Sequence, residues 1–108
     1  MKISGSIAIN MEFELIFSER AEEEAKAAIY YYDHINQDLG SRFFAELLDT
    51  YKKLAITPEY YSFISSTRKN KLRDVKLQTF PYVVIFEIQE NTVYIISVMN
   101  TSRKPFFS

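Results

Sequence analysis

Cationic side chains gather in one short stretch of the chain, where they could bind phosphate groups or an acidic protein surface. This basic cluster places five cations within nine residues: Arg68, Lys69, Lys71, Arg73 and Lys76. Asp74 is the only acidic residue among them. A dense cationic patch attracts polyanions and acidic surfaces by long-range electrostatics. The same composition also suits a solvated strand face, so the cluster predicts either an anion-binding surface or a plain exposed strand.

Other residue types narrow the chemistry. The sequence has no Cys, which excludes a disulfide scaffold, a thiolate zinc site and a cysteine nucleophile. Two glycines, Gly5 and Gly40, cannot form a glycine-rich phosphate loop. His34 is the only histidine and could act as a base near neutral pH, but its acidic surroundings favour a surface position. The densest group of carboxylates, Glu19 and Glu22 to Glu24, falls on one expected helix without the pattern of a metal cage. We therefore expect no metal and no cofactor.

Clustered aromatic residues predict a protein-binding surface. Tyr30, Tyr31 and Tyr32 are consecutive on an expected helix. Successive side chains there point about 100° apart, so at least one of the three must be exposed. A second group lies in an expected loop and consists of Tyr60, Tyr61 and Phe63. Exposed apolar patches mark interfaces, although these rings could instead extend the core.

The composition is that of one globular domain. The chain has 108 residues, of which 47% are hydrophobic and 25% charged, enough for a single modest core. Charge is distributed unevenly, with a net −5 over residues 1–40 and +4 over residues 68–108. No apolar stretch approaches the ~20 residues of a membrane helix, and residues 1–10 lack a signal-peptide core. We expect a cytoplasmic protein without a membrane partner.

Hydrophobic periodicity predicts one strand and then two helices. Apolar and acidic residues alternate over residues 11–17, as in a half-buried strand. Ser18 is a favourable N-cap for a helix that extends to about Ile35. After a loop at residues 36–40, Ser41 is expected to cap a second helix that ends at Thr57. The apolar stripe expected on this second helix consists of Phe44, Leu47, Leu48, Tyr51, Leu54 and Ala55.

Three strands are expected in the remaining sequence. Residues 72–78 alternate weakly, residues 82–88 are almost wholly apolar like a central strand, and residues 93–99 form a hairpin with them. The predicted fold is α+β with the order β-α-α-β-β-β, a helical hairpin packed on a small antiparallel sheet. Residues 1–10 are expected to be a poorly structured extension of a single domain at 11–108, with Met11 as an alternative start.

This order, together with several short motifs, resembles the RelE/ParE toxin superfamily. The motifs lie at residues 30–33 (YYYD), 39–44 (LGSRFF), 58 (P), 73 (R), 80–84 (FPYVV), 95–99 (IISVM) and 103–105 (RKP). The resemblance covers roughly residues 12–105. It implies the toxin of a type II toxin–antitoxin pair, without a cofactor, held inactive by a cognate antitoxin.

The two branches of the superfamily imply different activities. RelE-type members cleave messenger RNA in the ribosome with Lys, Arg and a late Tyr, which transfer protons and stabilise the phosphorane. ParE-type members act on DNA gyrase. Aligned on Tyr82, the chain departs from the nuclease pattern at four positions, Asp74, Val83, Thr101 and Phe107. The resemblance is therefore closer to the ParE branch, and no catalytic residue is assigned.

Residue roles follow from the resemblance and from the clusters above. If the chain were a nuclease, its remaining catalytic candidates would be Arg73, Lys76 and Arg103. The residues expected to bind the cellular target are Lys71, Arg73, Lys76, Arg103 and Lys104. Those expected to bind the antitoxin are Tyr30, Tyr31, Tyr60, Tyr61 and Phe63. Two alternatives to a ParE-like toxin remain open: a RelE-like ribosome-dependent endoribonuclease, whose partners are the ribosome and messenger RNA, and a non-toxic binding module.

Overall fold

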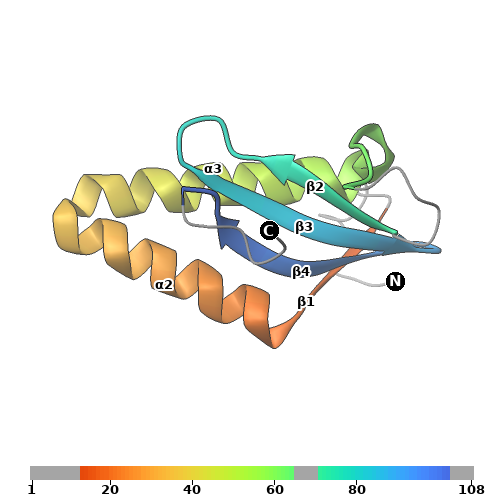
Figure 1. The fold of residues 1–108 in the computed structure, drawn as a ribbon, viewed down its shortest axis with the longest axis horizontal. Coiled ribbons are helices and arrows are strands. Elements are labelled where there is room, and N and C mark those ends of the chain that lie inside the picture. Colours follow the sequence, from red (N-terminus) through yellow and green to blue (C-terminus); the bar gives the residue numbers. More distant parts are fainter. Residues whose placement is uncertain (1–12, 65–70, 103–108) are drawn as a thin grey trace, which may run out of the picture.

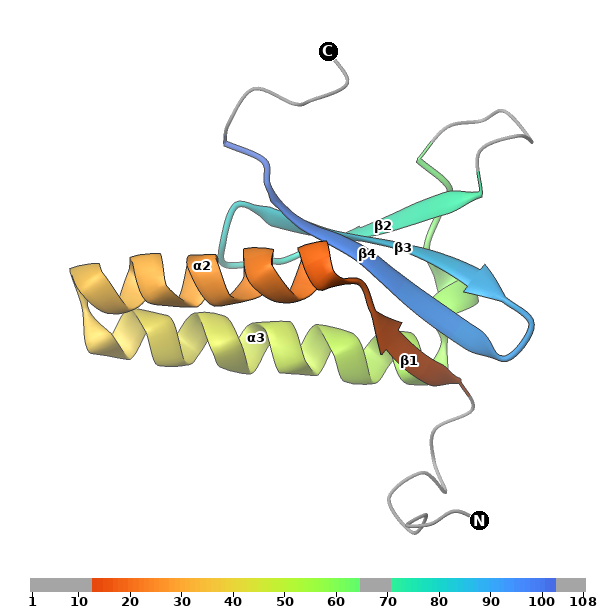
Figure 2. The same ribbon diagram turned by 90° about the horizontal axis from the view of Figure 1, so that it is seen from below.

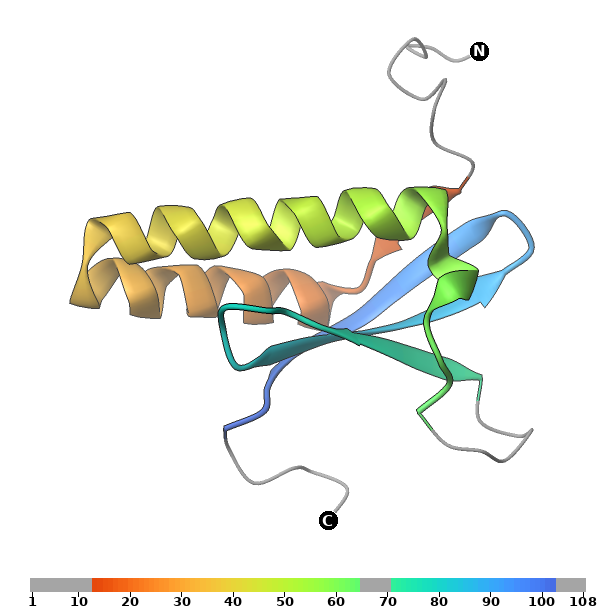
Figure 3. The same cartoon turned by 90° about the horizontal axis from the view of Figure 1, so that it is seen from above.

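A helical hairpin and a four-stranded sheet form two layers in the computed structural model, which describes residues 13–64 and 71–102 (Figure 1). The elements are β1 (Glu14–Phe17), α2 (Glu19–Ile35), α3 (Gln37–Ile56), the short 3-10 helix η1 (Pro58–Tyr60), β2 (Leu72–Lys76), β3 (Tyr82–Gln89) and β4 (Thr92–Asn100). The predicted α+β order is confirmed. Figures 2 and 3 show both helices on one side of the sheet, with the tip of the hairpin extending beyond it.

The sheet has the strand order β1-β4-β3-β2. β3 pairs antiparallel with both β2 and β4, and its first five residues are buried, as expected for a central strand. β1 pairs parallel with β4, so the sheet is mixed rather than wholly antiparallel. Parallel strands cannot be joined by a tight turn and need a long connection. Here α2, α3, β2 and β3 lie between β1 and β4 in the chain.

The two helices meet at a single residue, Asn36. Ser18 caps α2 as predicted, since its hydroxyl accepts a hydrogen bond from the Ala21 N–H at 2.9 Å. α3, however, begins at Gln37, and the expected loop at 36–40 and cap at Ser41 are wrong. The Asn36 side chain accepts a hydrogen bond from the Asp38 N–H at 2.8 Å and starts α3 there. An N-cap of this kind satisfies an otherwise free N–H in the first turn.

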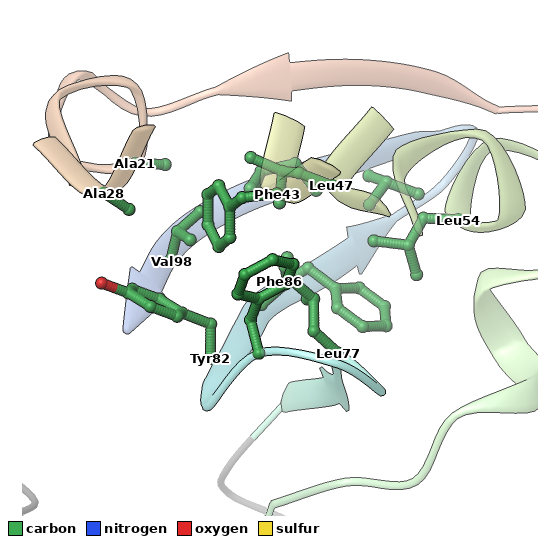
Figure 4. Packing of buried hydrophobic residues seen from close by; sticks show 13 residues of the cluster. Ala21, Ala28, Phe43, Leu47, Leu54, Leu77, Tyr82, Phe86 and Val98 are labelled. Carbon is green, nitrogen blue, oxygen red and sulfur yellow. The ribbon is translucent and has the colours of Figure 1, made fainter. Parts of the chain in front are cut away.

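Aromatic and aliphatic side chains from both layers form one core (Figure 4). Phe43 of α3 is fully buried, and its ring lies 5.2 Å from that of Phe80 and 5.0 Å from that of Tyr82. The stripe predicted for this helix is correct at Leu47, Leu54 and Ala55 but wrong at two positions. Phe44 and Leu48 are 47% and 40% exposed, because the face toward the sheet centres on Phe43.

Some predictions concern residues that lie outside the described parts of the chain. These are the extension at residues 1–10 with its alternative start at Met11, the cations Arg68, Lys69, Arg103 and Lys104, and Phe107. Within residues 13–64 and 71–102, no helix is long and apolar enough to cross a membrane.

Candidate protein-binding surfaces

The first candidate surface lies on α2 near the tip of the hairpin. Tyr30 is 66% exposed and Tyr31 is 56% exposed, whereas the Tyr32 ring turns inward and lies 5.4 Å from that of Phe43. The ring of His34 lies 4.6 Å from that of Tyr30, so this histidine is at the surface, as its position suggested. The prediction that the tyrosine run cannot be wholly buried is confirmed. We call Tyr30 and Tyr31 the tip surface.

The second candidate surface is the segment that follows α3, residues 58–64. Tyr60 is 81% exposed and Phe63 is 49% exposed, while Tyr61 is half-buried with its ring 6.2 Å from that of Phe86. The guanidinium of Arg73 on β2 helps to hold this segment in place. Its Nη1 donates hydrogen bonds to the Tyr61 carbonyl at 2.8 Å and the Glu59 carbonyl at 3.3 Å. We call residues 58–64 the strap.

The tip surface and the strap are separate. The contact of Tyr32 with Phe43 places Tyr31 level with the first third of α3. The remainder of that helix, Phe44 to Ile56, rises about 20 Å before the strap begins. Aromatic residues predicted to contact one partner therefore occupy two surfaces rather than one groove.

A separate groove lies beside each of the two surfaces. Tyr60 and Tyr61 border a groove of about 620 Å³ between α3 and β2, which Lys76 also lines. Tyr31 and Tyr82 border a second groove, of about 470 Å³, between α2 and the end of β4. An extended partner could occupy either groove and contact the adjacent exposed rings.

The basic cluster does not form one continuous face in the described region. Val75 and Val84 pair across β2 and β3 and lie on the side of the sheet that packs against the helices. Because side chains alternate along a strand, Arg73 shares this inner side, whereas Lys76 lies on the outer one. Lys71 is exposed just before β2 begins. The expected target-binding cations therefore point in different directions.

The outer side of the sheet is largely apolar around Asp74 and Lys76. Val83, opposite Lys76, is only 4% exposed, and Ile85, opposite Asp74, is 5% exposed. Burial raises the pKa of the Asp74 carboxyl above its ordinary value, an effect that the positive charge of Lys76 partly offsets. Thr101 lies in a turn after β4, where its N–H donates to the Pro81 carbonyl at 2.7 Å. Lys76 is thus the one cation among these five described residues.

Two glutamates have structural roles that the sequence did not reveal. The Glu24 carboxylate accepts hydrogen bonds from the Ser97 hydroxyl at 2.7 Å and the Val98 N–H at 2.8 Å. It thereby caps β4 where that strand extends beyond β1. Glu46 accepts a hydrogen bond from the Thr79 N–H at 3.1 Å, in the β2–β3 connection. No periodic signal links these pairs, which lie far apart in sequence.

No group of His, Cys, Asp and Glu side chains in the described residues is arranged to hold a metal ion. The geometry offers exposed aromatic rings, two open grooves and scattered cations. These features suit binding to another macromolecule better than acid–base chemistry on a small substrate.

Comparisons with known proteins agree with this description. Residues 15–105 match the family described as ParE toxin of type II toxin-antitoxin system, parDE. A solved structure described as the chromosomal ParDE TA system from P. aeruginosa superposes with a TM-score of 0.71 at 14% identity, covering 82% of this chain and 96% of that one. At this identity the likeness shows the fold alone. No curated protein matches the sequence significantly.

Proposed function

Since this chain belongs to the family of ParE toxins of type II toxin–antitoxin systems, we propose that it poisons a protein target, with DNA gyrase as the first candidate, and that a cognate antitoxin neutralises it. The proposal distinguishes a protein-binding poison from a ribosome-dependent nuclease. It also assigns the exposed aromatic rings to the antitoxin.

The residues on the outer side of the sheet are the observation that favours a protein-binding poison over a nuclease. Cleavage of RNA through its own 2′-hydroxyl needs a proton acceptor, a proton donor and cations near the phosphorane. In the alignment on Tyr82, Asp74 and the buried Val83 fall at two positions where RelE-type members have cations. An ionised carboxylate repels a phosphate, and a buried valine offers neither charge nor proton. Lys76 alone cannot supply these functions.

Exposed rings support the assignment of the antitoxin contacts. Tyr30, Tyr31, Tyr60 and Phe63 are between 49% and 81% exposed. Tyrosine is enriched among the residues that dominate binding energy at interfaces, because its large ring buries much surface at a low entropy cost. A partner that covers both the tip surface and the strap would remove this apolar area from water.

The test compares the chain with and without its cognate antitoxin. Purified toxin is expected to inhibit supercoiling by DNA gyrase, and equimolar antitoxin is expected to restore it. Primer extension on transcripts after induction is expected to show no new cleavage sites. Discrete cuts between codon positions in the ribosomal A site would instead establish the RelE-like nuclease and overturn the proposal. Loss of growth inhibition after reversal of the Lys76 charge would place the target contact on the outer side of the sheet.

A further inference from the structure

β2 lies at the edge of the sheet, and the strap covers only part of it. Phe63 forms a single antiparallel bridge with Arg73, and the Ile64 N–H donates to the Leu72 carbonyl at 2.8 Å. In the described region, Asp74 to Lys76 has no strand partner on this side. An uncovered edge presents unpaired N–H and C=O groups to any other strand, and proteins commonly protect such edges.

Arg73 attaches the strap to this edge by three contacts. Its two hydrogen bonds to the carbonyls of Glu59 and Tyr61 fix the backbone of the strap. Its guanidinium carbon also lies 4.1 Å from the centroid of the Phe63 ring, a cation–π contact. One guanidinium nitrogen, Nη1, donates both hydrogen bonds while the guanidinium plane packs on the ring, and the weakly hydrated, planar group of an arginine suits such stacking better than the compact, strongly hydrated lysine ammonium.

We infer that Arg73 latches the strap over the β2 edge, and that release of the strap exposes an edge that pairs with β2 of a second copy of this chain. This inference does not depend on the toxin's target or antitoxin. It identifies Arg73 as a positioning residue and the second copy as the occupant of the opened edge.

The sequence of β2 is complementary to itself. The bond from Ile64 to the Leu72 carbonyl shows that Leu72 turns its backbone groups toward the free edge, so the alternating residues Asp74 and Lys76 do the same. Antiparallel pairing of two β2 strands about Val75 sets Asp74 opposite Lys76 of the partner subunit. It does so twice, by symmetry. Cross-strand pairs of opposite charge stabilise a sheet, and like charges destabilise it.

Light scattering coupled to size-exclusion chromatography tests the inference over a range of concentrations. Wild type and Lys71→Gln, which removes a neighbouring exposed cation, are expected to be monomers. Arg73→Gln is expected to form a reversible dimer. Adding Lys76→Asp should weaken that dimer at least tenfold, because Asp74 then faces a second carboxylate. Adding Asp74→Lys as well exchanges the two charges and should restore the dimer.

Hydrogen exchange separates the latch from a general loss of folding. The Ile64 amide should exchange at least tenfold faster in Arg73→Gln than in wild type, while the amides of β3 keep their protection. Arg73→Lys retains the charge without the fork and should show the same faster exchange if Arg73→Gln does not fold. Unchanged exchange at Ile64 would overturn the latch. A monomeric but folded Arg73→Gln, or a dimer indifferent to Lys76→Asp, would overturn the self-pairing edge.

Discussion

The Asp74 carboxyl has a folded-state environment that disfavours its charged form. Burial raises its pKa, and the attraction of Lys76 lowers it by less. A carboxyl whose pKa is higher in the folded than in the unfolded state stabilises the fold most at low pH, where it is protonated in both states. That contribution is lost as the pH rises from the unfolded-state pKa, about 3.9, through the folded-state pKa.

Replacing Asp74 with Asn should therefore stabilise the protein at neutral pH. We expect Asp74→Asn to increase the free energy of unfolding at pH 7 and the difference from wild type to shrink toward pH 3. Urea denaturation at several pH values measures this difference in the free energy of unfolding. Asp49→Asn is the control, because its carboxylate forms an exposed pair with Lys53 at 3.2 Å and should change stability by no more than about 0.5 kcal/mol. A difference that grows toward acid pH would contradict the desolvation argument.

The role of each cation of β2 depends on the residues that surround it in the fold and not on its charge alone. The sequence identified Arg73 and Lys76 as cations on a strand, and both residues lie there. It could not show that the partners of Arg73 are backbone carbonyls 12 and 14 residues earlier in the chain. Nor did it show that the pleat separates the two side chains. Residue type was therefore predictable, whereas the contact that gives Arg73 its role depended on tertiary structure.

Both helices were predictable at the scale of elements, but the limits and orientation of α3 were not. Periodicity and the cap at Ser18 identified α2 correctly. For α3, both Asn36 and Ser41 are plausible caps, and Phe43 and Phe44 are the same residue type only 100° apart on the helix. Contact with the rings of Tyr32, Phe80 and Tyr82 selects Phe43 for the core. The sequence of the helix alone contains no comparable information.

Two adjacent phenylalanines test this orientation of α3. Phe43→Ala should destabilise the protein by about 3–5 kcal/mol, because it leaves a cavity beneath the sheet. Phe44→Ala should cost less than about 1 kcal/mol, since its side chain is already 47% exposed. Chemical denaturation monitored by circular dichroism gives both values. Equal losses from the two substitutions would mean that α3 is rotated relative to the orientation described above.

At the scale of the whole molecule, folding places the exposed aromatic residues of the tip surface and those of the strap far apart. The order of elements predicted the two layers, and the strap follows α3 as expected for a loop. The distance between the tip surface and the strap is set by the length of α3 and by the antiparallel return of the chain (Figure 3). Because the rise of α3 separates them by about 20 Å, a partner that contacts both surfaces must span at least that distance.

This separation predicts how substitutions on the two surfaces combine. Tyr30→Ala with Tyr31→Ala, and Tyr60→Ala with Phe63→Ala, should each weaken antitoxin binding about tenfold or more, because exposed aromatic residues commonly dominate such interfaces. Lys52→Ala, on the exposed side of α3, is the control and should bind as wild type does. Residues more than about 10 Å apart that share no neighbours contribute additively, so the free-energy losses of the two pairs should sum within about 0.5 kcal/mol when combined. Isothermal titration calorimetry with the cognate antitoxin measures each of these binding free energies.

A coupling free energy above about 1 kcal/mol between the two pairs would show that one antitoxin element connects the two surfaces rigidly. An effect from only one pair would restrict the antitoxin to that surface. Additive losses would mean that the antitoxin reaches the tip surface and the strap through independent contacts along the hairpin.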